Sequence, residues 1–191
     1  MLAEAKKSAN LLRFSADIAD YGESSVGSTS GAYKDHLLRS GLAVSGNITP
    51  DIYKSITNVC ENLGVPNGCV TAFIFADPNY QAACLTTGPD ECILQFSSAL
   101  VNSLNMDELS FVIGHELGHF LLEHKGVLTN DLAPESFLSN RAQEISADRI
   151  GVIGARNLDA SISALIKTVS GLDNSLIRFD VAEFLYFIGE S

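Results

Sequence analysis

The stretch of sequence at residues 105–125 reads NMDELSFVIGHELGHFLLEHK. Asn105 suits a helix N-cap, and Glu108 three residues later completes the pattern of a capping box, so we predict one long helix ending near Lys125. Its core side is expected from apolar residues that recur every three or four positions, which are Leu109, Val112, Ile113, Leu117 and Phe120. Gly114 and Gly118 are costly inside a helix, so another segment is expected to approach closely there.

His115, Glu116 and His119 form an HExxH pattern inside this helix. Because histidines at i and i+4 are one turn apart, both imidazoles project from the same face and can bind one metal ion. Glu116 lies at the edge of that face, where its carboxylate can reach a metal-bound water. Two histidines and a glutamate on one buried face need partners that compensate for their loss of hydration. A structural role in the core is the usual alternative, but a metal ion would pair with these groups directly.

A hydrolytic zinc site needs a third protein ligand and one open position for water. Glu144 is the candidate third ligand, because it lies in the next predicted helix after His119. Asp148 follows one turn later, where its carboxylate can accept the spare N–H of a ligand histidine and orient the ring. In the alternative interpretation, both carboxylates solvate an exposed helix face and pair with Arg141 or Arg149.

The other two histidines are given no ligand role. His124 lies five residues past His119, which is about 140° around a regular helix, so we predict a surface residue. His36 lies just beyond a Gly/Ser-rich stretch at residues 22–31 and is interpreted as a solvated loop residue. A latch or inhibitory ligand is the alternative for His36.

Further helices are expected from capping residues and apolar spacing. They are predicted at residues 1–21, 50–63, 135–156, 159–170 and 180–188. The apolar side of the first is expected to contain Leu11, Leu12, Phe14 and Ile18. In the second, Thr49 is the expected cap, Pro50 takes the first helical position and Gly64 ends the helix.

Three β-strands are predicted from runs rich in β-branched and aromatic residues. They cover residues 70–76, 81–85 and 92–96, and a Gly-Pro-Asp turn joins the last two as a hairpin. The order of helix, small sheet and helices predicts an α+β fold with a small antiparallel sheet and a helical metal-binding lobe. Residues 1–48 are then an N-terminal helix with a Gly/Ser-rich connector, and residues 49–191 are the metal-binding domain.

Composition and charge limit the function classes. Hydrophobic residues make up 46% of the chain and charged residues 18%, which is too apolar for a disordered protein. The formal net charge of −11 and the absence of a Lys/Arg cluster argue against nucleic acid as a partner. The sequence contains no apolar run long enough for a membrane span and no signal-peptide apolar region, which predicts a cytoplasmic protein.

The four cysteines leave an alternative for the compartment. Cys60 and Cys69 flank one turn, and Cys84 and Cys92 flank another. Disulfides between them would indicate a secreted or periplasmic protein, whereas four reduced, partly buried thiols are the simpler interpretation. A Cys-x-x-Cys zinc site is excluded by the spacing.

Two motifs together resemble one group of peptidases. The segment 115–119, His-Glu-Leu-Gly-His, and the segment 144–151, Glu-Ile-Ser-Ala-Asp-Arg-Ile-Gly, are similar to the HExxH and E-x-x-A-D-R-x-G signatures of the HtpX-like gluzincin metallopeptidases. This group includes the CAAX prenyl proteases and the mitochondrial Oma-type proteases. The Met-Asp-Glu-Leu run at 106–109 resembles the start of the group's metal-binding helix, and the similarity extends over about residues 50–170.

The resemblance implies a zincin-like fold and a zinc-dependent endopeptidase acting on peptides or proteins. It also implies one Zn²⁺ per chain, held by His115, His119 and Glu144, with Glu116 as general base and Asp148 supporting a ligand histidine. An edge strand of the small sheet, at residues 81–85 or 92–96, would bind the peptide substrate. Transmembrane helices and a downstream His-Pro-x-x-x-Arg segment, frequent in the group, are absent from this sequence. Neither a membrane substrate nor an oxyanion-stabilising residue is therefore carried over.

Two other functions remain open from sequence. One is a non-catalytic or latent zinc-binding scaffold, although retention of Glu116 argues against a purely structural site. The other is a regulatory metallopeptidase that cleaves a transcriptional repressor. The E-x-x-A-D-R-x-G motif fits the HtpX-like group better. Substrate specificity and oligomeric state are not encoded in either motif.

Overall fold

The computed structural model describes residues 1–13, 37, 39–124, 134–172, 175–177 and 180. The helices in this part of the chain are α1 (Leu2–Asn10), α3 (Pro50–Leu63), α4 (Ser98–Ser103), α5 (Met106–Leu121), α6 (Pro134–Ala155) and α7 (Leu158–Ser170), with a 3₁₀ turn η2 (Asn67–Cys69). The strands are β1 (Gly41–Ala43), β2 (Val70–Phe75), β3 (Ala82–Gly88) and β4 (Glu91–Ser97). The molecule is a mixed α+β structure, as predicted.

The four strands form one sheet in the order β1-β2-β4-β3. The predicted hairpin is confirmed, since β3 and β4 pair antiparallel. The prediction of a wholly antiparallel sheet is wrong, because β4 inserts between β3 and β2 and runs parallel to β2. Strand β1, which pairs antiparallel with β2, was not predicted, because three residues are too few to show an alternating pattern.

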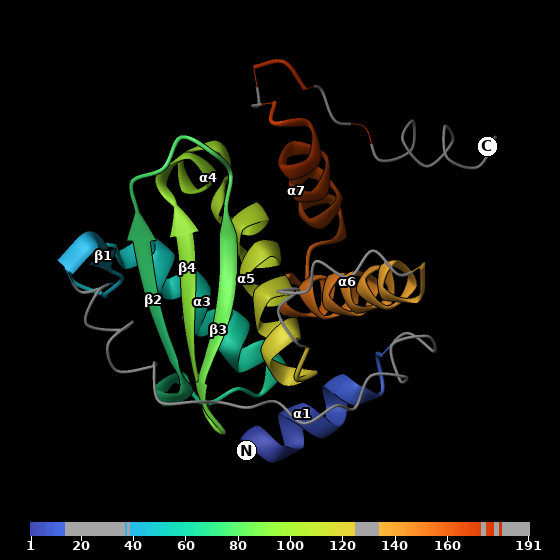
Figure 1. Cartoon of the computed structure of the whole chain (residues 1–191). Coiled ribbons are helices and arrows are strands. Elements are labelled where there is room, and N and C mark those ends of the chain that lie inside the picture. The colour runs from blue at the N-terminus through green and yellow to red at the C-terminus, as the bar shows by residue number, and fades with distance from the viewer. Residues whose placement is uncertain (14–36, 38, 125–133, 173–174, 178–179, 181–191) are drawn as a thin grey trace.

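Both faces of strand β4 are buried. Cys92, Leu94 and Phe96 belong to the main core, which they share with residues of α3 and α5. Ile93 packs on the opposite face with Phe73 in a smaller cluster. Figure 1 shows α3 and α5 on the same side of the sheet, so the long helix is held against the strands as well as the other helices.

Helix α5 is the centre of the molecule, and α6 crosses it at very short range. A Cβ atom built on Gly114 would lie 3.0 Å from the Cα of Gly151, and one on Gly118 would lie 3.0 Å from the Cα of Ala147. The prediction of close approach at both glycines is therefore confirmed. The contact matters for the site because it places the middle of α6 beside the HExxH segment of α5 (Figure 1).

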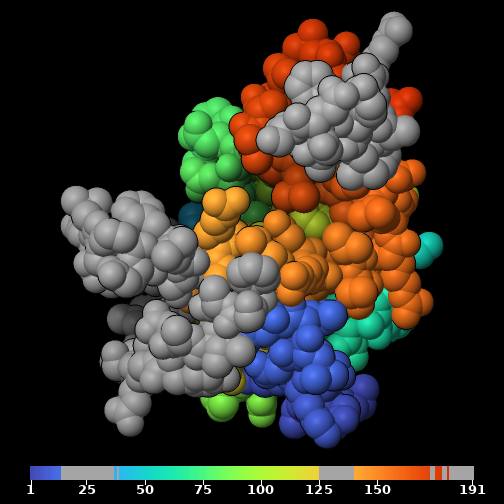
Figure 2. Space-filling view, turned by 90° about the vertical axis from the view of Figure 1, so that its right-hand side faces the viewer, coloured from blue at the N-terminus to red at the C-terminus, as the bar shows by residue number. Residues whose placement is uncertain are grey.

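The first helix is shorter than predicted. Helix α1 ends at Asn10, and Leu11 is 85% exposed, so the predicted apolar side is wrong at that residue. The buried side of α1 is instead formed by Leu2, Ala5 and Ala9. Small alanines let the short helix pack against the core. Figure 2 shows α6 on the surface between α1 and α7.

The ends of α3 and α7 agree with the prediction. Each is followed by a glycine in the left-handed conformation, Gly64 with φ of 71° and Gly171 with φ of 70°. Thr49 precedes Pro50 as expected, but the Thr49 side chain does not cap the helix. It bonds back to Ser45 instead.

Several predicted segments lie outside the described residues, among them the Gly/Ser-rich stretch at 22–31, His36 and all but the first residue of the helix predicted at 180–188. Among the helices that the structure does describe, none combines the length and the apolar character that crossing a membrane requires.

Candidate functional site

Three donor atoms from α5 and α6 converge at one point. The Nε2 atoms of His115 and His119 are 3.1 Å apart. Glu144 lies opposite them, with Oε2 at 3.3 Å from His115 Nε2 and Oε1 at 3.7 Å from His119 Nε2. The three predicted ligands are thus brought together, and their donor atoms could hold a metal ion.

The dimensions of this triangle suit a small divalent ion. Two nitrogens bound to tetrahedral zinc at about 2.0–2.1 Å are separated by roughly 3.3 Å, and a carboxylate oxygen ligand stands at a similar distance. Two imidazole nitrogens that face each other at 3.1 Å also need a cation or a proton between their lone pairs. The donor set of two imidazoles and one carboxylate is one that zinc uses in hydrolytic sites.

Asp148 lies where the sequence placed it, beside the first histidine. Its Oδ1 is 2.9 Å from Nδ1 of His115. A carboxylate at Nδ1 holds a ring proton on that nitrogen and orients the ring so that Nε2 points toward Glu144 and His119, where it could exchange its own proton for a metal ion. The spacing of four residues between Glu144 and Asp148 puts the two carboxylates one above the other on α6, so both face α5.

The two histidines have pKa values displaced in opposite directions. Burial alone would lower the pKa of His115, but hydrogen bonds to Asp148 and Glu144 outweigh it and raise the pKa to about 10. Burial and then the neighbouring charge of His115 lower the pKa of His119 to about 4. Without an ion, His115 is therefore the positively charged member of the pair and His119 is neutral. The pKa of Glu144 is lowered, chiefly by its hydrogen bond to His115.

Glu116 stands between the histidines and strand β3. Burial raises the pKa of its carboxyl group, and the charge of Glu144 adds to the rise. His115 and the backbone N–H of Cys84, which donates to the Glu116 carboxylate, act in the opposite direction. Cys84 belongs to β3, so the edge of the sheet reaches the predicted base directly.

His124 contradicts the prediction of a surface residue. It is only partly exposed, and its Nδ1 lies 2.9 Å from Nδ1 of His119. The prediction assumed a regular helix to Lys125, whereas α5 ends at Leu121 and Glu123 adopts a left-handed conformation with φ of 56°. A glycine or asparagine at 123 would have signalled that turn, but the position is a glutamate.

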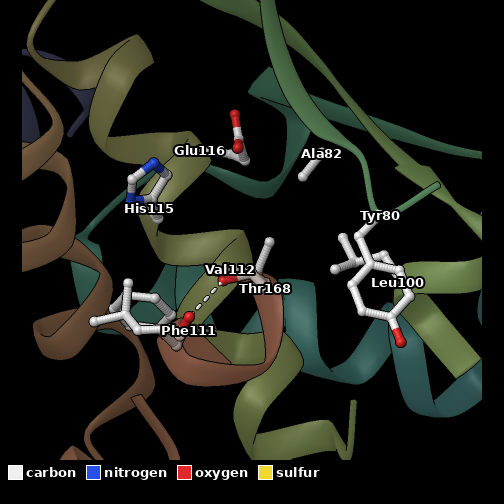
Figure 3. Close-up of a pocket in the computed structure, with 9 residues that line it drawn as sticks. Tyr80, Ala82, Leu100, Phe111, Val112, His115, Glu116 and Thr168 are labelled. Atoms are coloured by element: carbon white, nitrogen blue, oxygen red, sulfur yellow. Dashed lines mark hydrogen bonds between the residues drawn. The ribbon is translucent and has the colours of Figure 1, made fainter. Parts of the chain in front are cut away.

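A cavity of about 170 Å³ opens next to Glu116 and His115. Its walls are mostly apolar and come from α5, α7 and the sheet side: Tyr80, Ala82, Leu100, Phe111, Val112, Leu165 and Thr168. Figure 3 shows Glu116 and Ala82 on one side of this space and Leu100 and Tyr80 on another, with the Tyr80 hydroxyl pointing away from His115 and Glu116. No sequence pattern indicated this cavity, because its lining residues are scattered between Tyr80 and Thr168.

The four cysteines are free thiols. Cys60 and Cys92 are buried, and burial raises the pKa of Cys60 to about 12. A hydrogen bond to Cys92, together with burial, raises the pKa of Cys84. Thiols with raised pKa values are poor nucleophiles and poor metal ligands at neutral pH, so the structure agrees with the interpretation of four reduced cysteines.

Comparison with known proteins gives one family. Residues 49–138 match the sequence model of Peptidase family M48. The matched segment contains β2, β3, β4 and the whole of α5 with its HExxH pattern, and it ends six residues before Glu144 (144 − 138). No solved structure gives a significant match to the chain. The family match indicates a peptidase and confirms the resemblance predicted from the motifs: this chain is similar to Peptidase family M48 over residues 49–138.

Proposed function

We propose that this protein is a zinc-dependent endopeptidase with its metal on His115, His119 and Glu144. The observation that carries the proposal is the convergence of three donor atoms within 4.8 Å of one another, beside a half-buried glutamate. A structural site would use four protein ligands and needs no base, whereas three ligands leave one position for water. Glu116 is the proposed base for that water.

The proposed chemistry divides between the metal and the chain. Bound zinc supplies a water with its pKa lowered from 15.7 toward about 7 and polarises the scissile carbonyl. Glu116 accepts the proton of the attacking water and passes it to the leaving amine, which contributes about 10²–10⁴ in rate. The raised pKa of Glu116 suits this role, because it brings the carboxyl group closer to the pH at which it must both take and release a proton.

Strand β3 is the proposed support for the peptide. The sequence left two candidates, residues 81–85 and 92–96, but β4 is flanked by β2 and β3 and offers no edge. The backbone of Cys84 lowers the pKa of Glu116 by hydrogen bonding, which supports the proposal that the outer side of β3 faces the site. An extended substrate that pairs with this edge would bring its backbone close to Glu116 and to the residues that would hold the metal.

The apolar cavity beside Glu116 is the proposed pocket for a substrate side chain. It lies within reach of the same peptide, since Ala82 of β3 and His115 of α5 both line it. The Thr168 hydroxyl donates to carbonyls of its own helix, at 2.9 Å to Ala164 and 3.0 Å to Leu165, so its proton is already used. Aliphatic or aromatic residues are therefore the expected occupants.

The experiment that tests the function combines metal content with hydrolysis. Purified protein should contain about one zinc per chain by elemental analysis and cleave an internally quenched peptide library. Glu116→Gln should keep the zinc and lose hydrolysis by about 10²–10⁴-fold, because only the base is removed. His115→Ala should lose the zinc itself.

A matched control comes from an exposed glutamate on α3. Glu61→Gln removes the same charge far along the chain and should leave both zinc and hydrolysis unchanged. Hydrolysis by Glu116→Gln at the wild-type rate would refute the assigned base. Full zinc content without cleavage of any peptide would favour the latent or scaffold alternative, and cleavage of a repressor protein alone would favour the regulatory one.

A further inference from the structure

We propose that His124 is a positioning residue that accepts the Nδ1 proton of His119 and so holds the His119 ring with Nε2 aimed at the metal position. The inference rests on the proposed function, because it assigns His119 Nε2 to the metal. It goes further in giving the second ligand histidine a partner of its own, in the way that Asp148 serves the first.

Two contacts join His124 to His119. Their Nδ1 atoms are 2.9 Å apart, which is hydrogen-bond distance for two ring nitrogens. The backbone N–H of His124 also donates to the carbonyl oxygen of His119 at 2.9 Å. Their ring planes meet at 66° with centroids 5.1 Å apart, so the edge of one ring faces the other. A contact through both backbone and side chain fixes the ring more firmly than either alone.

The end of α5 is built in a way that produces this contact. A regular helix would carry residue 124 about 140° away from residue 119. Glu123 breaks the helix with φ of 56°, a conformation that is uncommon for a residue with a side chain. The Glu123 carboxylate is paired with Lys6 at 3.0 Å, which ties the turn to α1. The left-handed conformation of Glu123 turns the chain so that His124 lies beside His119.

The position of the proton follows from the other nitrogen of the ring. His119 Nε2 lies 3.1 Å from His115 Nε2 and 3.7 Å from Glu144 Oε1, so it must present a lone pair to an ion held there. A neutral imidazole has one N–H, and for His119 that proton is then on Nδ1. Only one proton fits between two nitrogens at 2.9 Å. His119 is therefore the donor and His124 the acceptor.

The two ligand histidines are thus oriented by different chemistry. Asp148 accepts from His115 at 2.9 Å with a carboxylate, and His124 accepts from His119 at the same distance with an imidazole. Orienting partners of ligand histidines commonly affect metal affinity by 10- to 100-fold. His124 would provide such an effect without adding negative charge to a site that already holds Glu144 and Asp148.

The first test is zinc affinity, measured by competition with a chromophoric chelator. His124→Leu keeps the approximate size of the side chain but removes the acceptor, and should weaken zinc binding by about 10- to 100-fold. His124→Asn places an amide oxygen close to the position of Nδ1 and should restore affinity to within about threefold of wild type. Equal affinity of His124→Leu and wild type, or equal weakness of the Leu and Asn variants, overturns the proposal.

Glu61→Gln on α3 is the control, since it changes an exposed carboxylate and leaves both His124 and the turn at Glu123 in place. Its zinc affinity should remain that of wild type. Loss of affinity in this variant, as large as in His124→Leu, would assign the effect to a general disturbance of the fold and overturn a specific role for the imidazole.

A second measurement depends neither on activity nor on a variant that folds. Long-range ¹H–¹⁵N NMR spectra of the wild-type protein report which ring nitrogen of each histidine carries a proton. We expect a proton on Nδ1 of His119 and none on Nδ1 of His124, with and without zinc. The reverse assignment overturns the inference. Absence of zinc uptake by the wild type contradicts the proposed function instead, and the NMR result still decides the role of His124.

Discussion

Helix α5 carries two polar clusters that differ in how their charges are compensated. The N-terminal cluster centres on Glu108, whose carboxylate receives hydrogen bonds from Lys167 Nζ at 2.6 Å, Ser163 Oγ at 2.6 Å and the backbone N–H of Asn105 at 2.8 Å. The other, two turns along, brings the imidazoles of His115 and His119 together with Glu144. Both clusters join α5 to a later helix, α7 in the first case and α6 in the second.

The difference separates a cluster that is complete within the protein from one that could hold a metal ion. Glu108 and Lys167 are 3% and 1% exposed and neutralise each other, so the first cluster is complete within the protein. In the second, two ring nitrogens face each other at 3.1 Å and the third member, Glu144, is 59% exposed. A buried ion pair holds helices together, whereas two imidazoles and a carboxylate that converge at the surface could bind a metal ion.

The largest effect on stability should come from breaking the first cluster. Lys167→Met leaves Glu108 buried without its cation and should reduce the free energy of unfolding by about 3–5 kcal/mol, measured by urea denaturation. Zinc bound per folded molecule should not change. Lys6→Met is the matched control, because Lys6 pairs with the exposed Glu123 and should contribute no more than about 1 kcal/mol. Equal losses in the two variants would contradict the contrast drawn between buried and exposed pairs.

A smaller effect, and one of a different kind, is expected from the second cluster. Asp148→Ala should weaken zinc affinity by about 10- to 100-fold, or about 1.4–2.7 kcal/mol, because His115 loses the acceptor that orients it. Asp148→Asn should recover part of the loss. Chelator competition measures the affinity, and urea denaturation of the metal-free protein should show a smaller loss than Lys167→Met. A variant that binds zinc like the wild type would remove Asp148 from the site.

The smallest expected effect is a pH dependence of the stability difference between wild type and Lys167→Met. Burial alone would raise the pKa of Glu108, but the hydrogen bonds from Lys167 and Ser163 outweigh it and hold the pKa below its ordinary 4.5. The stability that Glu108 contributes is therefore present above pH 4.5 and is lost as the pH falls below that value. In Lys167→Met the uncompensated burial should raise the pKa of Glu108, so this group should stabilise the variant as the pH falls.

The stability difference between wild type and Lys167→Met should consequently narrow from pH 7 toward pH 4. Denaturation curves of the metal-free proteins across that range measure it, and the histidines common to both proteins cancel in the difference. A gap that widens on acidification would mean that Glu108 is not the group responsible.

Local patterns were enough to predict most of the elements around the site. The capping box of Asn105 and Glu108 is present in the structure, and the five residues predicted for the core side of α5 are buried. The hairpin and the glycine ends of α3 and α7 also agree. These features depend on interactions within a few residues, which a pattern of capping, turn and apolar residues can express.

Predictions failed where the outcome depended on distant segments. The parallel pairing of β2 with β4 arises because β4 lies between β2 and β3, and no strand pattern specifies such an order. The pair Glu108–Lys167 joins residues 59 positions apart, so neither residue could be linked to the other in advance. His124 was placed on the surface because the left-handed turn at Glu123 has no sequence signal.

The order of residues alone was sufficient to put His115, Glu116 and His119 on one face of a helix, because a period of 3.6 residues determines that face. Folding alone decided that Glu144 would meet them, since the meeting requires α6 to approach Gly114 and Gly118 at backbone contact. Spacing along a helix is a local property of the backbone, and the crossing of two helices is a property of their packed surfaces.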